Sequence, residues 1–563
     1  MIIRLAGALA AAVLLAPPAL AQRPAPAEPA IAIVPAPASV TPRAGRFVLG
    51  TRTVIWADAP SAALGRQLAR WLEPATGYAL AVRTGGRAPT SNAIVLRRDA
   101  SLARLGAEGY ALDVGRARVV ARAPAAAGLF YAAQTMRQLL PPEIFREAPV
   151  AGVAWTMPAA SIEDRPRFAW RGGHLDVGRH FMPKEFVEKY IDLLALHKMN
   201  VFHWHLTEDQ GWRLEIRKYP RLTEVGAWRG ESLVGRQQLQ PDSARWTFDG
   251  EPHGGYYTQA DAREIVAYAK ARFVTVVPEI EMPGHARAAI AAYPELGVTG
   301  QPVAVGTRWG VYDDVLNVDS TTLRFMQDVL GEVMEIFPGP YIHVGGDEAV
   351  KAQWKASPRV QARMTALGVA DEHALQSWFL GQMDAFLTAH GRRLVGWDEI
   401  LEGGPLAPGA TVMSWRGTEG GVAAARAGHD VVMAPGSHTY FDHYQSLDTI
   451  AEPIAIGGYL PLDTVYAFEP VPAALTPAEA AHVLGAQAQL WTEYMRDPKK
   501  VEYMAFPRLC AFAEVMWTPR ARRDLADFRA RLAAAHLARL RALDVNYRAP
   551  VDAGTASADA GRR

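Results

Sequence analysis

The chain has very little cysteine and no excess of charge of either sign. Its 563 residues include a single cysteine, Cys510, so no disulfide can form within the chain and no cysteine-based zinc cluster can be built. The 59 lysines and arginines nearly balance the 58 aspartates and glutamates, which leaves a formal net charge of +1. Nucleic-acid-binding surfaces are typically strongly basic, so this balance argues against a nucleic-acid partner.

Long apolar runs are also scarce. No stretch approaches the roughly 20 apolar residues of a membrane span. The run from Leu5 to Leu15 is preceded by Arg4 and followed by Ala19-Leu20-Ala21, a pattern that predicts an export signal peptide over residues 1–21. The alternative is an N-terminal membrane anchor. We expect cleavage and an exported mature protein without stable membrane insertion. A cysteine-poor exported chain fits the bacterial periplasm better than a secreted disulfide scaffold.

Composition and periodicity divide the remaining chain. Residues 22–43 are rich in proline and alanine, which predicts a linker and domain entry. Residues 44–165 mix short strand-like runs with two helical segments, which predicts a small accessory α+β domain without an acid/base cluster. Residues 521–563 predict a C-terminal helix packed on the exterior of the preceding domain, followed by a disordered tail.

Residues 166–520 have a different pattern, in which short apolar runs alternate with helix-sized spacers. Eight such runs separated by helices are typical of an α/β fold, the (β/α)8 TIM barrel, with loop insertions. The predicted strands are Gly172–Val177, Val201–Leu206, Phe273–Ile280, Tyr341–Val344, Leu394–Trp397, Thr411–Trp415, Asp430–Ala434 and Leu484–Trp491.

Acidic and aromatic residues follow nearly every predicted strand. In a TIM barrel the carboxyl ends of the strands carry the active site. Carboxylates bind hydroxyl groups, and aromatic rings stack on the apolar face of a sugar, so this pattern favours a polyhydroxylated ligand. The residues include Asp176, Glu208, Asp209, Glu279, Glu281, His285, Asp347, Glu348, Trp397, Asp398, Trp415, Tyr440, Asp442, Trp491 and Glu493.

Two motifs each allow two interpretations. His203-Trp204-His205 places both imidazoles on one side of a strand, which fits either a metal pair or two buried, hydrogen-bonded histidines. Gly345-Gly346 before Asp347-Glu348 fits a plain turn at the strand end. It also fits a backbone that passes close to a ligand while the acid pair projects toward it.

Taken in order, the motifs resemble the family 20 glycoside hydrolases, the β-N-acetylhexosaminidases. The resemblance covers residues 32 to 520. It rests on Val34-Pro35, Trp170-Arg171-Gly172, Leu175-Asp176, Arg179-His180-Phe181, Glu208-Asp209-Gln210-Gly211-Trp212, Val277–His285, His343–Glu348, Trp397-Asp398-Glu399, Ser414–Gly417, Tyr440-Phe441-Asp442 and Leu490–Glu493.

The resemblance implies an exo-acting, retaining hydrolase of terminal N-acetylglucosamine or N-acetylgalactosamine on oligosaccharides or glycoconjugates. Its mechanism is substrate-assisted, so the sugar's own 2-acetamido oxygen is the nucleophile. Glu348 is then the general acid/base, with a pKa expected to be raised by Asp347. Asp347 orients the acetamide. No cofactor and no metal are implied.

The resemblance also implies roles for the surrounding residues. Tyr440 would hold the acetamido oxygen, and three tryptophans would enclose the acetyl methyl and the ring: Trp397, Trp415 and Trp491. The sugar hydroxyls would be bound by Arg171, Asp442 and Glu493. Asp209 and His285 would support the acid.

Two positions depart from the family pattern, and two other functions remain open. Glu208 stands where many members have Asp, and Gly178 where many have Ser, which bears on subsite detail. One alternative is a metal-dependent barrel hydrolase using His203 and His205 with His285 or His343. The other is a non-catalytic sugar-binding protein. The sequence does not decide between gluco and galacto substrates.

Overall fold

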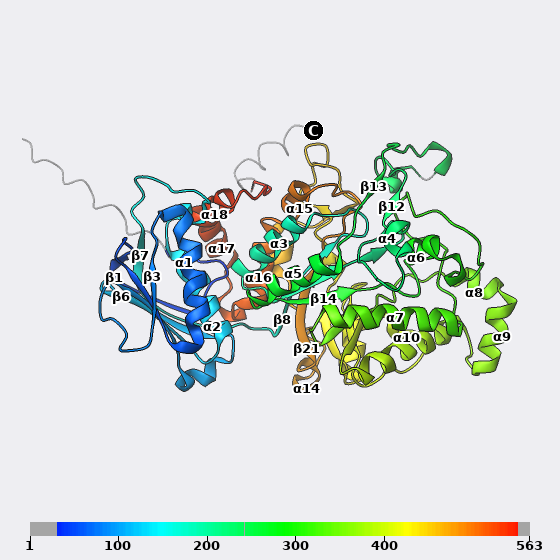
Figure 1. Ribbon diagram of the computed structural model, residues 1–563, viewed down its shortest axis with the longest axis horizontal. Coiled ribbons are helices and arrows are strands. Elements are labelled where there is room, and N and C mark those ends of the chain that lie inside the picture. Colours follow the sequence, from blue (N-terminus) through cyan, green and yellow to red (C-terminus); the bar gives the residue numbers. More distant parts are fainter. Residues whose placement is uncertain (1–30, 241, 550–563) are drawn as a thin grey trace, which may run out of the picture. The chain divides into compact units, whose positions relative to one another are not determined.

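The computed structural model describes residues 31–240 and 242–549. The predicted signal peptide and nearly all of the predicted disordered tail lie outside these residues. Within the described part, no helix is both long enough and apolar enough to cross a membrane. The described residues form a seven-stranded sheet, followed along the chain by a closed eight-stranded barrel (Figure 1).

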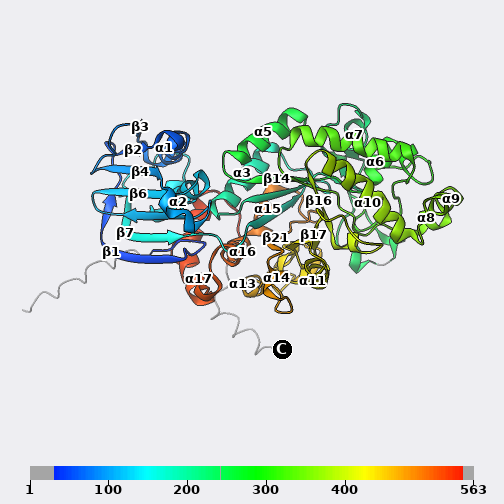
Figure 2. The same ribbon diagram turned by 90° about the horizontal axis from the view of Figure 1, so that it is seen from below.

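The accessory domain is a mixed sheet with strand order β1-β7-β5-β6-β4-β2-β3, with β1 at one edge and β3 at the other (Figure 2). Helices α1 (Ala62–Thr76) and α2 (Ala126–Leu139) pack on it. The strands are β1 Ser39–Val48, β2 Val54–Ala57, β3 Ala81–Thr84, β4 Ala93–Arg98, β5 Tyr110–Val114, β6 Arg118–Ala123 and β7 Thr156–Asp164. The domain is therefore α+β, as the sequence predicts.

The accessory domain begins earlier than its composition suggests. Residues predicted as linker and domain entry already belong to the packed structure, because Ile33 and Val34 are at most 1% exposed and β1 starts at Ser39. The backbone N–H of Val34 donates to Gln138 Oε1 at 2.9 Å. The high proline and alanine content predicted a linker, but these residues flank Ile33 and Val34, whose side chains pack into the core.

The barrel contains all eight predicted strands, and every neighbouring pair is parallel. Their interiors read as continuous buried runs because both faces of a parallel barrel strand are covered. The strands are β8 Trp170–Asp176, β9 Val201–His205, β14 Thr275–Glu279, β15 Tyr341–His343, β16 Arg393–Trp397, β17 Thr411–Ser414, β18 Asp430–Met433 and β21 Val483–Ala488. The TIM-barrel prediction is confirmed.

Helices connect most of these strands, including α3 Lys184–Leu196, α5 Gln259–Lys270, α7 Ser320–Ile336, α10 Glu372–Ala389 and α11 Glu419–Arg426, and α16 Arg508–Trp517 follows the last strand. The link from β16 to β17 differs, since it contains the short 3-10 helix η7, Asp398–Leu401. Trp397 ends β16 and Trp415 follows β17 directly, so the two residues lie at the ends of paired strands.

A buried ion pair joins the accessory domain to the barrel. Lys198, between α3 and β9, lies 2.7 Å from Asp164 Oδ2 at the end of β7, and both side chains are 0% exposed. The same carboxylate accepts hydrogen bonds from Tyr110 Oη at 2.8 Å and from Trp517 Nε1 at 2.9 Å. Excluded from water, each charge depends on the other and on these donors.

The C-terminal helices bind both domains rather than the barrel alone, which corrects the sequence expectation. They run from α17 (Leu525–Arg531) through a π-helical turn to α18 (Leu537–Ala542). Arg531 pairs with Glu514 of α16 at 2.6 Å and donates to Ile33 O at 2.7 Å. Arg539 donates to Gln138 O at 2.6 Å.

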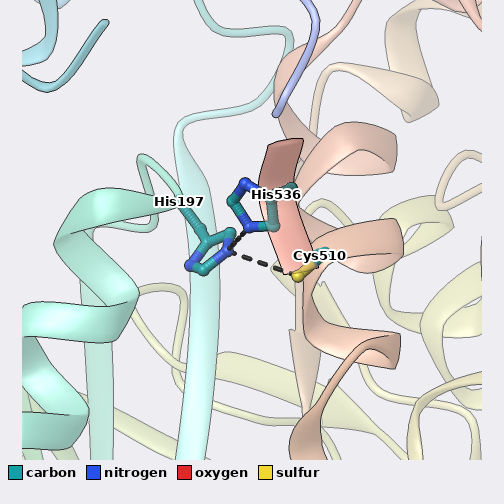
Figure 3. Close-up of side chains that lie close together, drawn as sticks. All are labelled: His197, Cys510 and His536. Atoms are coloured by element: carbon teal, nitrogen blue, oxygen red, sulfur yellow. Dashed lines mark hydrogen bonds between the residues drawn. The ribbon is translucent and has the colours of Figure 1, made fainter. Parts of the chain in front are cut away.

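Beneath these helices, the only cysteine of the sequence lies against His197 and His536 (Figure 3). His197 Nδ1 lies 2.7 Å from the carbonyl of Leu193, so Nδ1 carries the proton and Nε2 accepts. His536 Nε2 is 2.8 Å from that acceptor and Cys510 Sγ is 3.3 Å from it. Burial lowers the pKa of His197 to about 4 and raises that of the thiol. A neutral hydrogen-bonded cluster accounts for this geometry.

Replacing Lys198 with methionine tests the junction between the domains. Lys198→Met leaves the Asp164 carboxylate buried without its cationic partner, so we expect the free energy of unfolding to fall by about 3–5 kcal/mol. Urea denaturation followed by tryptophan fluorescence measures the change. Lys270→Met, at an exposed position at the end of α5, is the matched control. A loss no larger than that of the control would contradict the assigned role.

Candidate active site

One imidazole lies at the centre of the acidic residues at the carboxyl ends of the barrel strands. His285, in the loop after β14, contacts two carboxylates through Nδ1: Glu208 at 3.0 Å and Asp209 at 3.4 Å. Through Nε2 it contacts Asp347 at 3.5 Å and Glu348 at 3.4 Å. His285 therefore links the β9 loop to the β15 loop.

Electrostatics make His285 a cation. Burial opposes its charge, yet the carboxylates of Glu208 and Asp347 raise its pKa well above the ordinary value. Burial likewise opposes the charge on Glu208, but Arg179 and His285 hold the pKa of that carboxyl at about 2. The buried imidazolium is thus stabilised by a fixed carboxylate on its Nδ1 side.

The acid pair lies in the loop after β15, whose backbone is sharply turned. Gly345 and Gly346 have φ of +65° and +97°, and Glu348 itself has φ of +44°. A Cβ at Gly345 would overlap the Glu281 carboxyl group, so glycine is required there for space as well as conformation. The left-handed conformation of Glu348 costs about 1–3 kcal/mol, which the surrounding contacts must offset.

The two carboxyls of the pair have different proton affinities. Burial, followed by the charge of Glu348, raises the pKa of Asp347 to about 6, although His285 opposes this. The contact with His285 lowers the pKa of Glu348 against the effect of burial. The sequence expectation of a pKa of Glu348 raised by Asp347 is therefore wrong, because the contact with His285 outweighs the effect of burial.

An arginine that the sequence analysis did not assign lies in the site. Arg179 follows β8 by three residues and pairs with Glu208 at 2.5 Å and Asp176 at 3.5 Å. Its guanidinium lies 4.9 Å from the ring centre of Trp491. The motif Asp176-x-x-Arg179 at a strand end was the available signal.

Arg171 does not lie with the other predicted site residues, which corrects its assignment to the sugar hydroxyls. It is the second residue of β8, so it is near the amino end of the strand and away from the loops that carry the acids. Its guanidinium pairs with Glu108 of the accessory domain at 2.6 Å and donates to the carbonyls of Phe168 and Lys198. Arg171 is part of the domain junction.

Four predicted aromatic residues form one continuous wall. The ring centres of Trp397 and Trp491 are 5.8 Å apart, those of Trp491 and Tyr440 are 6.2 Å apart, and Tyr440 stacks with Trp415 at 6.2 Å. Hydrogen bonds fix two of the indoles, from Trp397 Nε1 to Glu279 at 2.9 Å and from Trp415 Nε1 to Glu399 at 2.8 Å.

Two more predicted residues, Asp442 and Glu493, are buried in the same region. Burial raises the pKa of each carboxyl to about 7, with Arg179 opposing the rise in both. Within the described residues, Asp442 Oδ1, Glu493 Oε2 and Asp347 Oδ1 have no hydrogen-bond partner. Buried polar atoms normally have partners, so these three oxygens indicate a ligand rich in hydroxyl and amide groups.

The histidines of β9 belong to the barrel interior. Glu279 lies 3.1 Å from His203 Nε2 and 2.8 Å from His343 Nδ1, and it also contacts His205 Nδ1. All four side chains are 0% exposed, and these imidazoles hold the pKa of Glu279 well below its usual range against burial. A catalytic metal needs an open coordination position, so this buried network favours structural histidines over the metal hydrolase.

Gly178 and Glu208, the two residues that depart from the family pattern, lie against each other. A Cβ on Gly178 would lie 2.6 Å from Glu208 Cβ and 3.2 Å from its Cγ. Glu208 in turn reaches Asp347 and Glu348 only through His285, while Asp209 is oriented by the backbone N–H of Arg287 at 3.0 Å. The Glu208 side chain therefore occupies the space that a side chain at position 178 would need.

The fold and the site together have the architecture of the glycoside hydrolase class of (β/α)8 barrels. The family models agree: "Glycosyl hydrolase family 20, catalytic domain" matches residues 168–520, and "Glycosyl hydrolase family 20, domain 2" matches residues 30–165. The chain therefore belongs to glycosyl hydrolase family 20.

Individual relatives are similar over most of this chain. A β-hexosaminidase of Porphyromonas gingivalis is 49% identical over 83% of the chain, and one of Vibrio furnissii is 38% identical over 75%. The matched parts are 58% and 66% of those two relatives' own lengths. A mutant β-hexosaminidase of Streptomyces plicatus, solved in complex with the product GlcNAc, is 35% identical with a TM-score of 0.79. That match covers 93% of this chain and 98% of the other.

The contact between positions 178 and 208 gives a prediction. Gly178→Ser forces the two backbone segments apart, so we expect a loss of about 1–3 kcal/mol in the free energy of unfolding. We also expect a lower kcat/KM, because Glu208 moves away from Arg179 and His285. Gly381→Ser is the control, since a Cβ there meets no atom within 4 Å. Equal behaviour of both variants would show that the space at 178 is unimportant.

Proposed function

We propose that this chain hydrolyses terminal β-linked N-acetylhexosamine residues, with retention of configuration, using the substrate's 2-acetamido group as nucleophile. The observation that carries the proposal is the placement of the acid pair. Asp347 and Glu348 contact the same nitrogen of His285, and these three ligand atoms lie within 4.8 Å of one another. Both carboxylates therefore act from one side of the site, which favours a nucleophile supplied by the substrate.

In the first step, Glu348 donates its proton to the glycosidic oxygen as the bond to the anomeric carbon breaks. The acetamido oxygen attacks that carbon, and a cyclic oxazolinium ion forms. Asp347 accepts a hydrogen bond from the acetamido N–H and offsets the developing positive charge. Since burial raises its pKa to about 6, Asp347 gains stability from the nearby cation in this step.

In the second step, Glu348 accepts a proton from water, and the resulting hydroxide attacks the anomeric carbon as the oxazolinium ring opens. Glu348 is then protonated again for the next cycle. His285 favours the first step, because its cation lies 3.4 Å from Glu348 and stabilises the carboxylate that proton donation leaves, and it is held on its other side by Glu208 and Asp209. The remaining exposure of Glu348, 42% of its side chain, is consistent with contact to an incoming water.

The terminal sugar is held by two sets of residues. The aromatic wall of Trp397, Trp415, Tyr440 and Trp491 faces the ring and the acetyl methyl group, and Tyr440 holds the acetamido oxygen. Asp442, Glu493 and, in place of Arg171, Arg179 bind the ring hydroxyls. The unpartnered oxygens of Asp442 and Glu493 support this assignment, as does the GlcNAc bound by the Streptomyces plicatus relative.

Substitution of the acid pair tests the proposal. We expect Glu348→Gln to lose about 10²–10⁴ in kcat on phenyl N-acetyl-β-glucosaminide, because the proton donor is gone. It should still bind a thiazoline mimic of the oxazolinium intermediate. Asp347→Asn should lose activity and thiazoline affinity together, because the acetamide is no longer oriented.

Glu335→Gln, on the exposed side of α7, is the control for these variants. A near-wild-type rate for Glu348→Gln would exclude it as the acid. Full activity on the corresponding glucoside, which has no acetamide, would exclude substrate assistance.

The proton affinity of Asp347 gives a pH prediction. Because its pKa is raised to about 6, the carboxyl is protonated below that pH and can no longer accept the acetamide N–H. Affinity for GlcNAc, whose acetamide keeps its N–H, should therefore be full above pH 7 and fall as the pH drops through about 6. Inhibition constants between pH 4.5 and 8 measure this. Affinity that stays constant down to pH 4.5 would contradict the assignment.

A further inference from the structure

The turn that carries the acid pair is attached to the rest of the barrel on both of its flanks. Asp347 and Glu348 lie between the peptide carbonyls of Gly346 and Ala349, and Glu348 has the left-handed φ of +44°. A shift of the backbone on either side would displace both carboxylates. The residues that bind these two carbonyls therefore help to fix the position of the acid pair.

The first carbonyl is bound by Gln376 of helix α10. Gln376 is 5% exposed, and its Nε2 donates to Gly346 O at 2.6 Å. The helix is itself firmly placed, since Leu375 and Phe379 on either side are fully buried. The Gln376 amide therefore holds the turn in a fixed position relative to α10.

The second carbonyl is bound by Lys351, immediately before helix α8 (Ala352–Ala356). Its Nζ donates to Ala349 O at 2.8 Å and also to Gln376 Oε1. The ammonium group lies 5.5 Å from the ring centre of Trp354, which is fully buried. Gln376 and Lys351 therefore form one hydrogen-bonded bridge from Gly346 O to Ala349 O.

We propose that Gln376 and Lys351 are positioning residues for the acid pair, holding the Asp347–Glu348 turn in its reactive conformation through this bridge. Neither side chain contacts the site's aromatic wall or the His285 cluster in any described interaction, so they act through the backbone. This inference rests on the proposed function, because it assigns the geometry of the proton donor named there.

Leaving-group dependence separates a positioning role from a structural one. A phenyl leaving group needs protonation by Glu348, whereas a 2,4-dinitrophenyl group departs with little assistance. Misplacing the donor should therefore affect the first substrate more. A displacement of about 1 Å can cost about 10²-fold in rate. For Gln376→Leu and Lys351→Met we expect kcat/KM on phenyl N-acetyl-β-glucosaminide to fall about 10²-fold, and on the dinitrophenyl substrate by a clearly smaller factor.

The chain offers matched controls on the same helices. Gln382→Leu changes an exposed glutamine of α10, and Lys355→Met changes an exposed lysine of α8. Both should keep the wild-type leaving-group dependence. Lys351→Arg, which can still donate to both oxygens, should recover much of the rate lost in Lys351→Met. Gln376→Glu replaces the donor to Gly346 O with a carboxylate and should behave like Gln376→Leu.

Thermal unfolding of each variant is measured together with the kinetics. The Lys351 side chain is only half-buried, so Lys351→Met provides the test if Gln376→Leu fails to fold. Equal losses on both substrates with wild-type thiazoline affinity, or an unchanged phenyl rate in a folded Lys351→Met variant, would overturn the positioning role. Wild-type protein that cleaves neither substrate would instead refute the proposed function, so the two failures are distinguishable.

Discussion

The site depends on one buried positive charge held among four carboxylates. If His285 were absent, the four carboxylates of Glu208, Asp209, Asp347 and Glu348 would repel one another at close range, and the first two are almost completely buried. The imidazolium lowers the proton affinity of Glu348, while burial raises that of Asp347, so adjacent residues differ in protonation behaviour. Arg179 completes the balance by neutralising Glu208. Two cations thus allow a dense acidic cluster to exist at one end of a barrel.

A further buried carboxylate, that of Glu279, organises the interior of the barrel. Glu279 is surrounded by three imidazoles and the indole N–H of Trp397. One ionised group therefore holds the barrel histidines and the first residue of the aromatic wall in place. The same histidines looked like metal ligands in the sequence because two of them alternate along one strand. Strand periodicity shows which residues share a face, but not whether the group opposite them is a metal ion or a carboxylate.

The sequence predicted the fold of both domains and most of the residues that gather at the carboxyl ends of the barrel strands, because these follow from local patterns. Eight apolar runs marked the barrel strands, and the acids and aromatics followed them at the correct end. Arg171 was misplaced because its motif was read without its position in β8. As the second residue of the strand it lies at the opposite end from the acids, a conclusion that barrel geometry alone could have given. Gln376 was not predictable in this way, since its contact with Gly346 joins residues 30 positions apart through a helix register that periodicity does not fix.

The C-terminal helices have a consequence for the order in which the molecule assembles. Arg531 and Arg539 bind the carbonyls of Ile33 and Gln138, so the accessory domain completes its contacts with residues made 498 and 401 positions later. A nascent chain leaving the ribosome therefore holds these two carbonyls unbound by the helices until α17 and α18 have emerged. The barrel is made in between, so the accessory domain reaches its final contacts only after the barrel has been synthesised.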